Sequence, residues 1–270
     1  MSPSRQGSSC TRCCVAADPI LLFGAGLLGL CLGSFLNVCI VRLPNDQSLL
    51  SPPSACPHCK HPIAWRDNIP VASWLLLKGR CRHCGVPISR QYPVVEAAVG
   101  LIWIAGVLAY GVSVQALTAG LFGTLLLGIA VTDARHYLIP DEYTWGGLVI
   151  GLALSLAAGV AGLLQAVLGA AVGFALLYAV ARVGQWVFKE EAMGGGDVKM
   201  MAMVGAFLGW KGVLLTIFLG ALLGSLIFVP LSLKKKRLVP FGVFLALGAG
   251  VTFVAGDAII AWYLHFLRGS

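Results

Sequence analysis

Charged residues are scarce in this sequence. Asp, Glu, Lys and Arg make up 11% of its 270 residues, whereas 58% are hydrophobic. A soluble domain of this length needs more polar surface, so the composition excludes a soluble globule and predicts an all-α polytopic membrane protein. The net charge of +8 gathers in particular loops between apolar runs. We therefore expect no nucleic-acid partner and interpret the basic residues as markers of topology in a lipid bilayer.

The N-terminal region lacks the marks of a cleaved signal peptide. Its apolar run Pro19–Val41 is longer than a signal-peptide core and has no persuasive small-residue cleavage site. We predict that it stays as a first transmembrane helix over residues 19–43. Residues 1–18 are polar and without periodicity, which predicts a flexible tail.

Further apolar runs predict about eight transmembrane helices, one of them short. After the first, the predicted spans are Pro93–Tyr110, Val112–Thr132, Tyr143–Ala158, Leu163–Val187, Val198–Gly209, Gly212–Leu233 and Val239–Leu267.

The distribution of Lys and Arg predicts the orientation of these spans. Of the 19 basic residues, 15 lie in the segments Arg42–Arg90, Asp133–Glu142, Arg182–Lys199 and Lys234–Arg237. The positive-inside rule places these segments in the cytoplasm. We therefore expect both termini to lie outside.

The longest polar insertion, residues 44–92, contains two CxxC pairs. Cys56 and Cys59 are separated by 21 residues from Cys81 and Cys84. This spacing is typical of a zinc ribbon in which four thiolates hold a structural Zn²⁺, and reduced cytoplasmic thiols agree with it. The alternatives are disulfides or free thiols. We predict a small cytoplasmic tetracysteine zinc subdomain between the first two spans.

Two acidic sites stand at the ends of apolar runs. Asp197 follows Gly194, Gly195 and Gly196, which leave room for another backbone, and Asp133 follows Leu117–Val131. A carboxylate beside the hydrocarbon is costly, which favours a functional role, although a turn with a helix-capping Asp is an alternative for Asp197. Two carboxylates that face each other share a proton, as an aspartic protease requires. One would activate water and the other would polarise the scissile carbonyl.

Five stretches in this order resemble the bacterial type IV prepilin peptidases, over nearly the whole chain. They are Gly33–Pro44, the two CxxC pairs, Arg90–Glu96, Asp133–Asp141 and Met193–Asp197. This family belongs to the intramembrane aspartic proteases with a glycine-x-glycine-Asp motif. The resemblance implies that Asp133 and Asp197 are the catalytic pair, that Gly194–Gly196 form the active-site loop, and that residues 93–270 form the protease domain.

The resemblance also implies substrates and a second activity. Such an enzyme lies in the bacterial inner membrane and removes a basic leader from type IV prepilins or type II secretion pseudopilins at the cytoplasmic face, after a glycine. It then methylates the new amino group with S-adenosylmethionine. The sequence has no glycine-rich Rossmann loop. Gly79 and Glu96 are the positions that the resemblance suggests for methylation.

Other acidic residues complete this interpretation. Asp141, Glu142, Glu190 and Glu191 lie in the two aspartate loops and are expected to attract a basic leader. Asp257 in the last span has no partner motif and ranks below the catalytic pair. Val243 stands where a second proline is common in the family, which weakens any substrate-positioning role for Val239–Val243.

Two other classes of function are compatible with membrane carboxylates and a zinc ribbon. A proton-coupled transporter usually keeps its carboxylates near the midplane in broken helices, and the sequence shows no inverted repeat. A non-catalytic assembly factor would use the zinc subdomain to dock partners. Peptide cleavage separates both from a protease.

Overall fold

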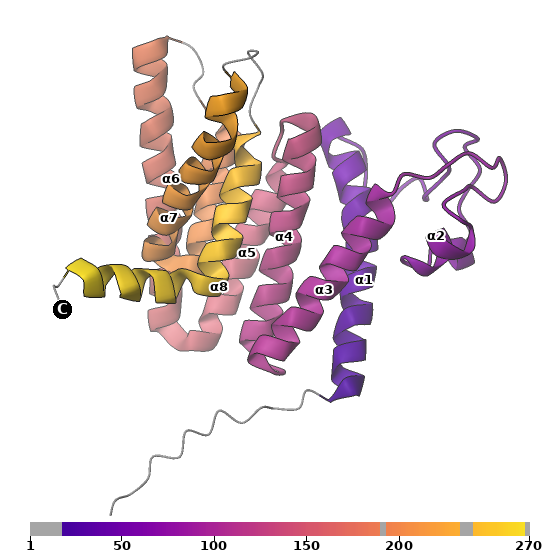
Figure 1. Cartoon of the computed structure of the whole chain (residues 1–270), viewed down its shortest axis with the longest axis horizontal. Coiled ribbons are helices and arrows are strands. Elements are labelled where there is room, and N and C mark those ends of the chain that lie inside the picture. Colours follow the sequence, from indigo (N-terminus) through magenta and orange to yellow (C-terminus); the bar gives the residue numbers. More distant parts are fainter. Residues whose placement is uncertain (1–17, 190–192, 233–239, 268–270) are drawn as a thin grey trace, which may run out of the picture.

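The computed structural model describes residues 18–189, 193–232 and 240–267, which form a bundle of long helices with a small lateral subdomain (Figure 1). The predicted tail over residues 1–18 and the basic cluster Lys234–Arg237 lie almost wholly outside the described residues, as do Glu190 and Glu191. Within the described ranges the only extended pairs are two isolated bridges, Ala55 with Pro62 and Arg80 with Pro87. The all-α prediction is therefore confirmed.

The helices begin and end where the sequence supplies caps and breaks. Helix α1 starts at Pro19, and the Asp18 carboxylate accepts a hydrogen bond from the Ile20 backbone N–H at 3.0 Å. Ser113 caps α4 in the same way through the Ala116 N–H. The elements of the bundle are α1 (Pro19–Arg42), α3 (Gln91–Tyr110), α4 (Val114–His136), α5 (Asp141–Ser155), α6 (Gly159–Phe188), α7 (Gly195–Ser232) and α8 (Phe241–Leu267).

Six stretches of the described chain are long and apolar enough to cross a membrane. Two of them are interrupted. The stretch Asp141–Val187 contains a 3₁₀ turn at Leu156–Ala158 followed by Gly159 with a positive φ of 74°. Helix α7 breaks at Gly209, whose φ of 66° and ψ of 177° are accessible to glycine alone. These two breaks divide the six stretches into eight helical rods, at the boundaries that the sequence predicts.

Glycines allow the helix pairs at the two lateral edges of the bundle to pack closely. At one edge Gly29 and Gly33 of α1 lie against the α3 backbone at Gly100 and Glu96. At the other edge Gly169 and Gly173 of α6 face Gly205 and Met201 of α7. Each pair is four residues apart, the small-xxx-small spacing of membrane helix contacts. Helices α4, α5 and α8 lie between these two pairs, around buried side chains such as Phe122, Met200 and Leu245 (Figure 1).

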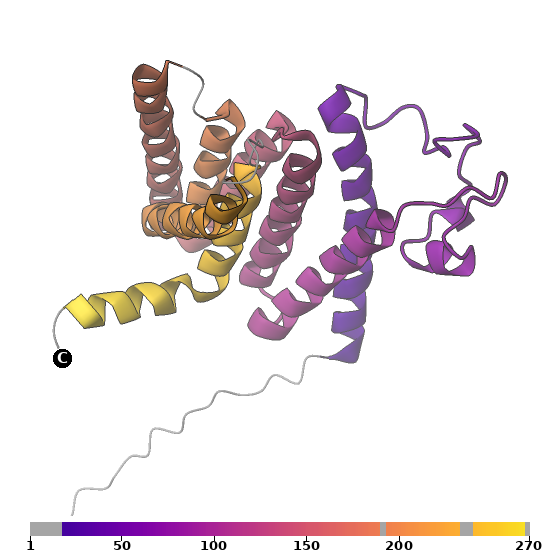
Figure 2. The same ribbon diagram turned by 45° about the horizontal axis from the view of Figure 1, so that its top comes forward.

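The polar insertion forms the lateral subdomain, which lies beyond α1 and α3 in both views (Figures 1 and 2). Its only α-helix is the short α2 (Ala72–Leu76), and a 3₁₀ turn spans Trp65–Asp67. A subdomain of this size buries little core and needs additional links to hold its loops.

The α6–α7 crossing generates a stability prediction. A Cβ atom on Gly205 would overlap the carbonyl group of Gly169, so Gly205→Val forces the two helices apart. We expect a loss of about 1–3 kcal/mol or more, seen as a lower unfolding temperature in detergent. Gly146→Val on exposed α5 is the matched control, because a Cβ there meets nothing within 4 Å. Equal unfolding temperatures for the two variants would contradict this packing.

Candidate active site

Asp133 lies in the last turns of α4 and is 5% exposed. The helix ends at Tyr137, which adopts a left-handed conformation and donates its N–H to the Asp133 backbone carbonyl at 2.9 Å. The apolar run before Asp133 drives the helix into the bundle, so the carboxylate is buried at the helix end. It cannot reach bulk water freely and depends on protein donors.

The donors come from the start of α8. The Val243 backbone N–H donates to Asp133 Oδ2 at 3.1 Å. Gly242 lies so close that a Cβ there would meet Asp133 Oδ2 at 2.9 Å. The first N–H groups of a helix have no partner within the helix, so a carboxylate is a natural acceptor for them. Position 243, where the sequence departs from the family pattern, is thus a direct neighbour of Asp133.

Asp197 lies in the first turn of α7 and is 9% exposed. Its backbone N–H bonds to the Gly194 carbonyl at 3.2 Å. Because Gly195 and Gly196 already belong to the helix, Asp197 lies inside the first turn and not at the capping position. A plain helix cap therefore does not account for this carboxylate.

Asp133 and Asp197 lie at the same end of the bundle, on segments that meet. Ile139 lies between their loops. A Cβ on Gly196 would come within 2.9 Å of Ile139 Cβ, and a Cβ on Gly242 within 2.7 Å of Ile139 Cδ1. Gly194 and Gly195 are exposed, so they leave open space beside Asp197. A pair of close carboxylates with an open approach suits general acid–base chemistry on water and a carbonyl.

An ion pair joins the two aspartate loops. Lys199 Nζ lies 2.7 Å from both carboxylate oxygens of Asp141, which starts α5. Asp141 is therefore already neutralised by a cation of the chain, contrary to the expectation that it attracts a basic ligand. The sequence analysis does not single out Lys199, because its partner Asp141 lies 58 residues away in the chain.

The four cysteines of the subdomain form one cluster. The Sγ atoms of Cys56, Cys59, Cys81 and Cys84 all lie within 4.8 Å of one another, and those of Cys56 and Cys84 are 3.8 Å apart. Tetrahedral Zn–S bonds of about 2.3 Å would separate the sulfurs by about 3.8 Å. The cluster could therefore hold a metal ion. All four are free thiols, which removes the disulfide alternative for this structure.

Cys56 and Cys84 differ in acidity. Backbone N–H groups of Cys59 and His58 lower the pKa of Cys56 to about 6, which favours the thiolate. At Cys84 the Val86 backbone group acts in the same direction, but burial and the contacts with the other three thiols outweigh it. Together they raise the Cys84 pKa to about 11. A cation is needed to keep four thiolates so close together.

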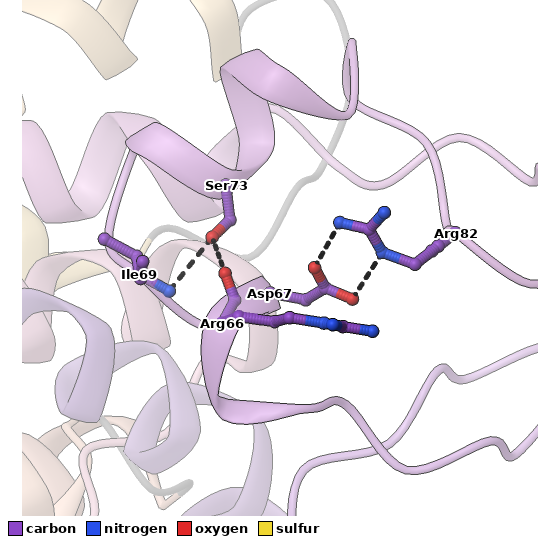
Figure 3. A network of polar contacts seen from close by, with 5 residues as sticks. All are labelled: Arg66, Asp67, Ile69, Ser73 and Arg82. Carbon is purple, nitrogen blue, oxygen red and sulfur yellow. Dashed lines mark hydrogen bonds and ion pairs between the residues drawn. The ribbon is translucent and has the colours of Figure 1, made fainter.

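Polar links hold the loops of the subdomain in place (Figure 3). The Arg82 guanidinium donates two hydrogen bonds to the Asp67 carboxylate, at 2.8 and 2.6 Å, and this lowers the pKa of Asp67. Ser73 Oγ accepts from the Ile69 N–H and donates to the Arg66 carbonyl, both at 3.0 Å. Because Arg82 lies within the second CxxC pair, the ion pair ties that pair to the turn at Trp65–Asp67.

Glu96 and Gly79, the two positions suggested for methylation, both contact residues of this subdomain. Glu96 is 8% exposed on α3, and its Oε2 accepts from the Val71 N–H at 2.7 Å. It thereby connects the bundle to the start of α2. Gly79 has a φ of 66°, and a Cβ there would come within 2.7 Å of the Trp74 ring. The structure therefore assigns packing and docking contacts to both residues, far from the aspartate pair along the chain.

Comparisons with known proteins cover both halves of the chain. Residues 27–110 match a family model described as the bacterial peptidase A24 N-terminal domain, and residues 120–229 match the type IV leader peptidase family. No solved structure matches.

Three curated relatives share the name prepilin leader peptidase/N-methyltransferase. The Myxococcus xanthus protein is 42% identical over 79% of this chain, and the match spans 64% of that protein. The Aeromonas hydrophila protein is 35% identical over 88% of this chain and 92% of its own length. The Stutzerimonas stutzeri protein is 38% identical, with 94% and 98% covered.

Proposed function

The chain belongs to the bacterial family of prepilin leader peptidases/N-methyltransferases, and from this premise we propose that it cleaves the leader from a prepilin or pseudopilin and methylates the new N-terminus. The observation that best supports the proposal is the meeting of Asp133 and Asp197, 64 residues apart in sequence, around Ile139 at one end of the bundle. The comparisons give no support to the transporter or assembly-factor alternatives.

The proposed cleavage needs no covalent intermediate. One aspartate takes a proton from water while the resulting hydroxide attacks the scissile carbonyl carbon. The protonated aspartate gives its proton to the carbonyl oxygen. The tetrahedral intermediate then collapses as the first aspartate passes the water-derived proton to the amide nitrogen, which leaves, and the second aspartate takes a hydroxyl proton back. We assign the base to Asp133, because a hydrogen bond from the Val243 N–H is stronger to an ionised carboxylate. Asp197 is then the protonated partner.

The site opens where a membrane-anchored substrate would reach it. The C-terminal ends of α1 and α4 and the N-terminal ends of α3, α5, α7 and α8 lie at the same end of the bundle (Figure 1). The basic residues Arg42, Arg90, Arg135 and Lys199 belong to this end, which supports a cytoplasmic placement. We therefore propose that Gly194 and Gly195 admit the extended leader segment at the cytoplasmic membrane surface.

For residues 44–92 we propose a cytoplasmic subdomain stabilised by one structural Zn²⁺. Cys56, Cys59, Cys81 and Cys84 would hold the ion, and four thiolates leave no open position for catalysis. For methylation we propose S-adenosylmethionine as the methyl donor, as the family name implies. The hydrogen bond from Val71 to Glu96 supports a role for Glu96 in holding the subdomain against α3, and Gly79 packs against Trp74 within the subdomain.

The aspartate pair generates the first test of this function. In a reaction with a purified prepilin and S-adenosylmethionine, Asp133→Asn and Asp197→Asn should each lower cleavage by about 10²–10⁴-fold, because an amide replaces neither a base nor an acid. Product mass spectrometry measures leader loss and methyl gain. Asp257→Asn removes a remote carboxylate and should cleave normally. Substantial cleavage by both active-site variants would refute the assignment, whereas methylation of a pre-cut pilin should survive.

The Val243 hydrogen bond gives a second, finer test. Val243→Pro removes the N–H donor but leaves Gly242, so kcat for leader cleavage should fall by up to about tenfold. Val243→Ala retains the N–H and should keep the native kcat. If the proline variant cleaves as fast as the alanine variant, the donor has no part in holding Asp133.

Metal content tests the subdomain. Elemental analysis of the purified protein should find about one zinc per chain, and Cys56→Ser or Cys81→Ser should lose it. Cys31→Ser, an exposed thiol on α1, should keep the metal. Native protein without metal would exclude the zinc proposal without touching the peptidase assignment.

A further inference from the structure

A cavity of about 920 Å³ opens at the end of the bundle opposite the aspartate pair. Its lining includes Gln115 near the start of α4, Gln165 near the start of α6, and Lys211 and Asp257. Gln115 and Asp133 are eighteen residues apart on α4, a rise of about 27 Å. The cavity is therefore distant from the proposed active site by almost the thickness of a bilayer core.

The break in α7 and the course of α8 create this cavity. Gly209 interrupts α7, and the residues on both sides of it line the space. The C-terminal part of α8 turns away from the bundle axis and runs across it, in both views (Figures 1 and 2). Phe253, Asp257, Ile260 and Leu264 line the cavity from α8, at the spacing of a single helix face.

Charges of both signs line the cavity without being paired. Neither Lys211 nor Asp257 belongs to an ion pair in the described part of the chain, either with each other or with a third residue. Lys211 Nζ lies 5.7 Å from the centroid of the Trp210 ring, which leaves its hydrogen-bonding capacity available. An unpaired cation and an unpaired anion facing one cavity suit a ligand that itself has both charges.

Aromatic side chains place the cavity at the level of a membrane surface. Tyr110, Trp210, Trp262 and Tyr263 all lie at this end of the bundle and are exposed. Trp and Tyr are enriched where lipid headgroups meet the hydrocarbon. The C-terminal part of α8 presents Trp262 and Phe266 as exposed apolar groups, as an interfacial segment does. A ligand in this cavity would therefore lie at the level of the lipid headgroups.

We propose that this cavity binds the phosphoethanolamine headgroup of a membrane phospholipid. Lys211 would pair with the phosphate and Asp257 with the primary ammonium, while the amides of Gln115 and Gln165 supply further hydrogen bonds. The acyl chains would leave along Phe207 and Leu264. The volume lies within the range of sites for ligands of this size. The site is separate from leader cleavage and does not depend on it.

Native mass spectrometry of the full chain in detergent provides the test. The protein is mixed with equal amounts of phosphatidylethanolamine, phosphatidylcholine and phosphatidylglycerol of the same acyl chains, and the retained lipid is identified. We expect phosphatidylethanolamine to be preferred over both others by about tenfold. The trimethylammonium of phosphatidylcholine has no N–H to donate to Asp257, and the glycerol group of phosphatidylglycerol has no positive charge to pair with it. Equal retention of the three lipids would overturn the proposal.

Two variants separate the roles of the charges. Asp257→Asn should abolish the preference for phosphatidylethanolamine while phospholipid is still retained, and Lys211→Gln should lower retention of all three lipids by about tenfold. Arg182→Gln and Asp46→Asn remove exposed charges elsewhere and should behave as the native protein. All four variants should still cleave prepilin, which shows that they fold. An unchanged lipid preference in a cleaving Asp257→Asn variant would exclude the site.

Discussion

The buried carboxylate of Asp133 at the C-terminal end of a helix is the constraint on which the site depends. The carbonyl end of α4 repels a negative charge, so this helix cannot stabilise the group that it positions. The first turn of α8 supplies what α4 lacks, through the Val243 N–H and the close approach of Gly242. The Asp133 carboxylate thereby links α4 to the start of α8, although Asp133 and Val243 are 110 residues apart in sequence. Ile139 fills the space between these two helices and the Asp197 loop.

This arrangement requires the helices to approach closely, and the glycines permit it. Gly242 and Gly196 both lie against Ile139, so a larger side chain at either position would push α8 or α7 away from α4. The α6–α7 and α1–α3 pairs use the same device at the two edges of the bundle. A membrane interior offers no hydrophobic force between helices, and such contacts gain their stability from close packing. The position of the active site and the packing of the bundle therefore have a common cause.

Much of the fold could be predicted because its signals are local. Long apolar runs, the Asp18 and Ser113 caps and the breaks near Gly159 and Gly209 each act on neighbouring residues, and the structure places helix ends close to them. The cysteine cluster also follows from spacing, since two CxxC pairs can approach only in a few ways. Pairing across the bundle has no local signal. The Asp141–Lys199 ion pair and the docking of Glu96 against Val71 join segments whose contact no periodicity reveals.

The contact between Val243 and Asp133 shows why part of a site is hidden from sequence. The donor is a backbone N–H, and every residue except proline has one, so a comparison of side chains at position 243 says little about it. What the sequence does specify is the start of α8 beside Gly242, whose first turn supplies this donor. A proline at position 243 would remove this donor, keep the helix start and leave Gly242 as the remaining backbone neighbour of Asp133. A site built on a helix terminus in this way can hold a carboxylate through different backbone groups, and its chemistry is then less sensitive to the side chain than to where the helix begins.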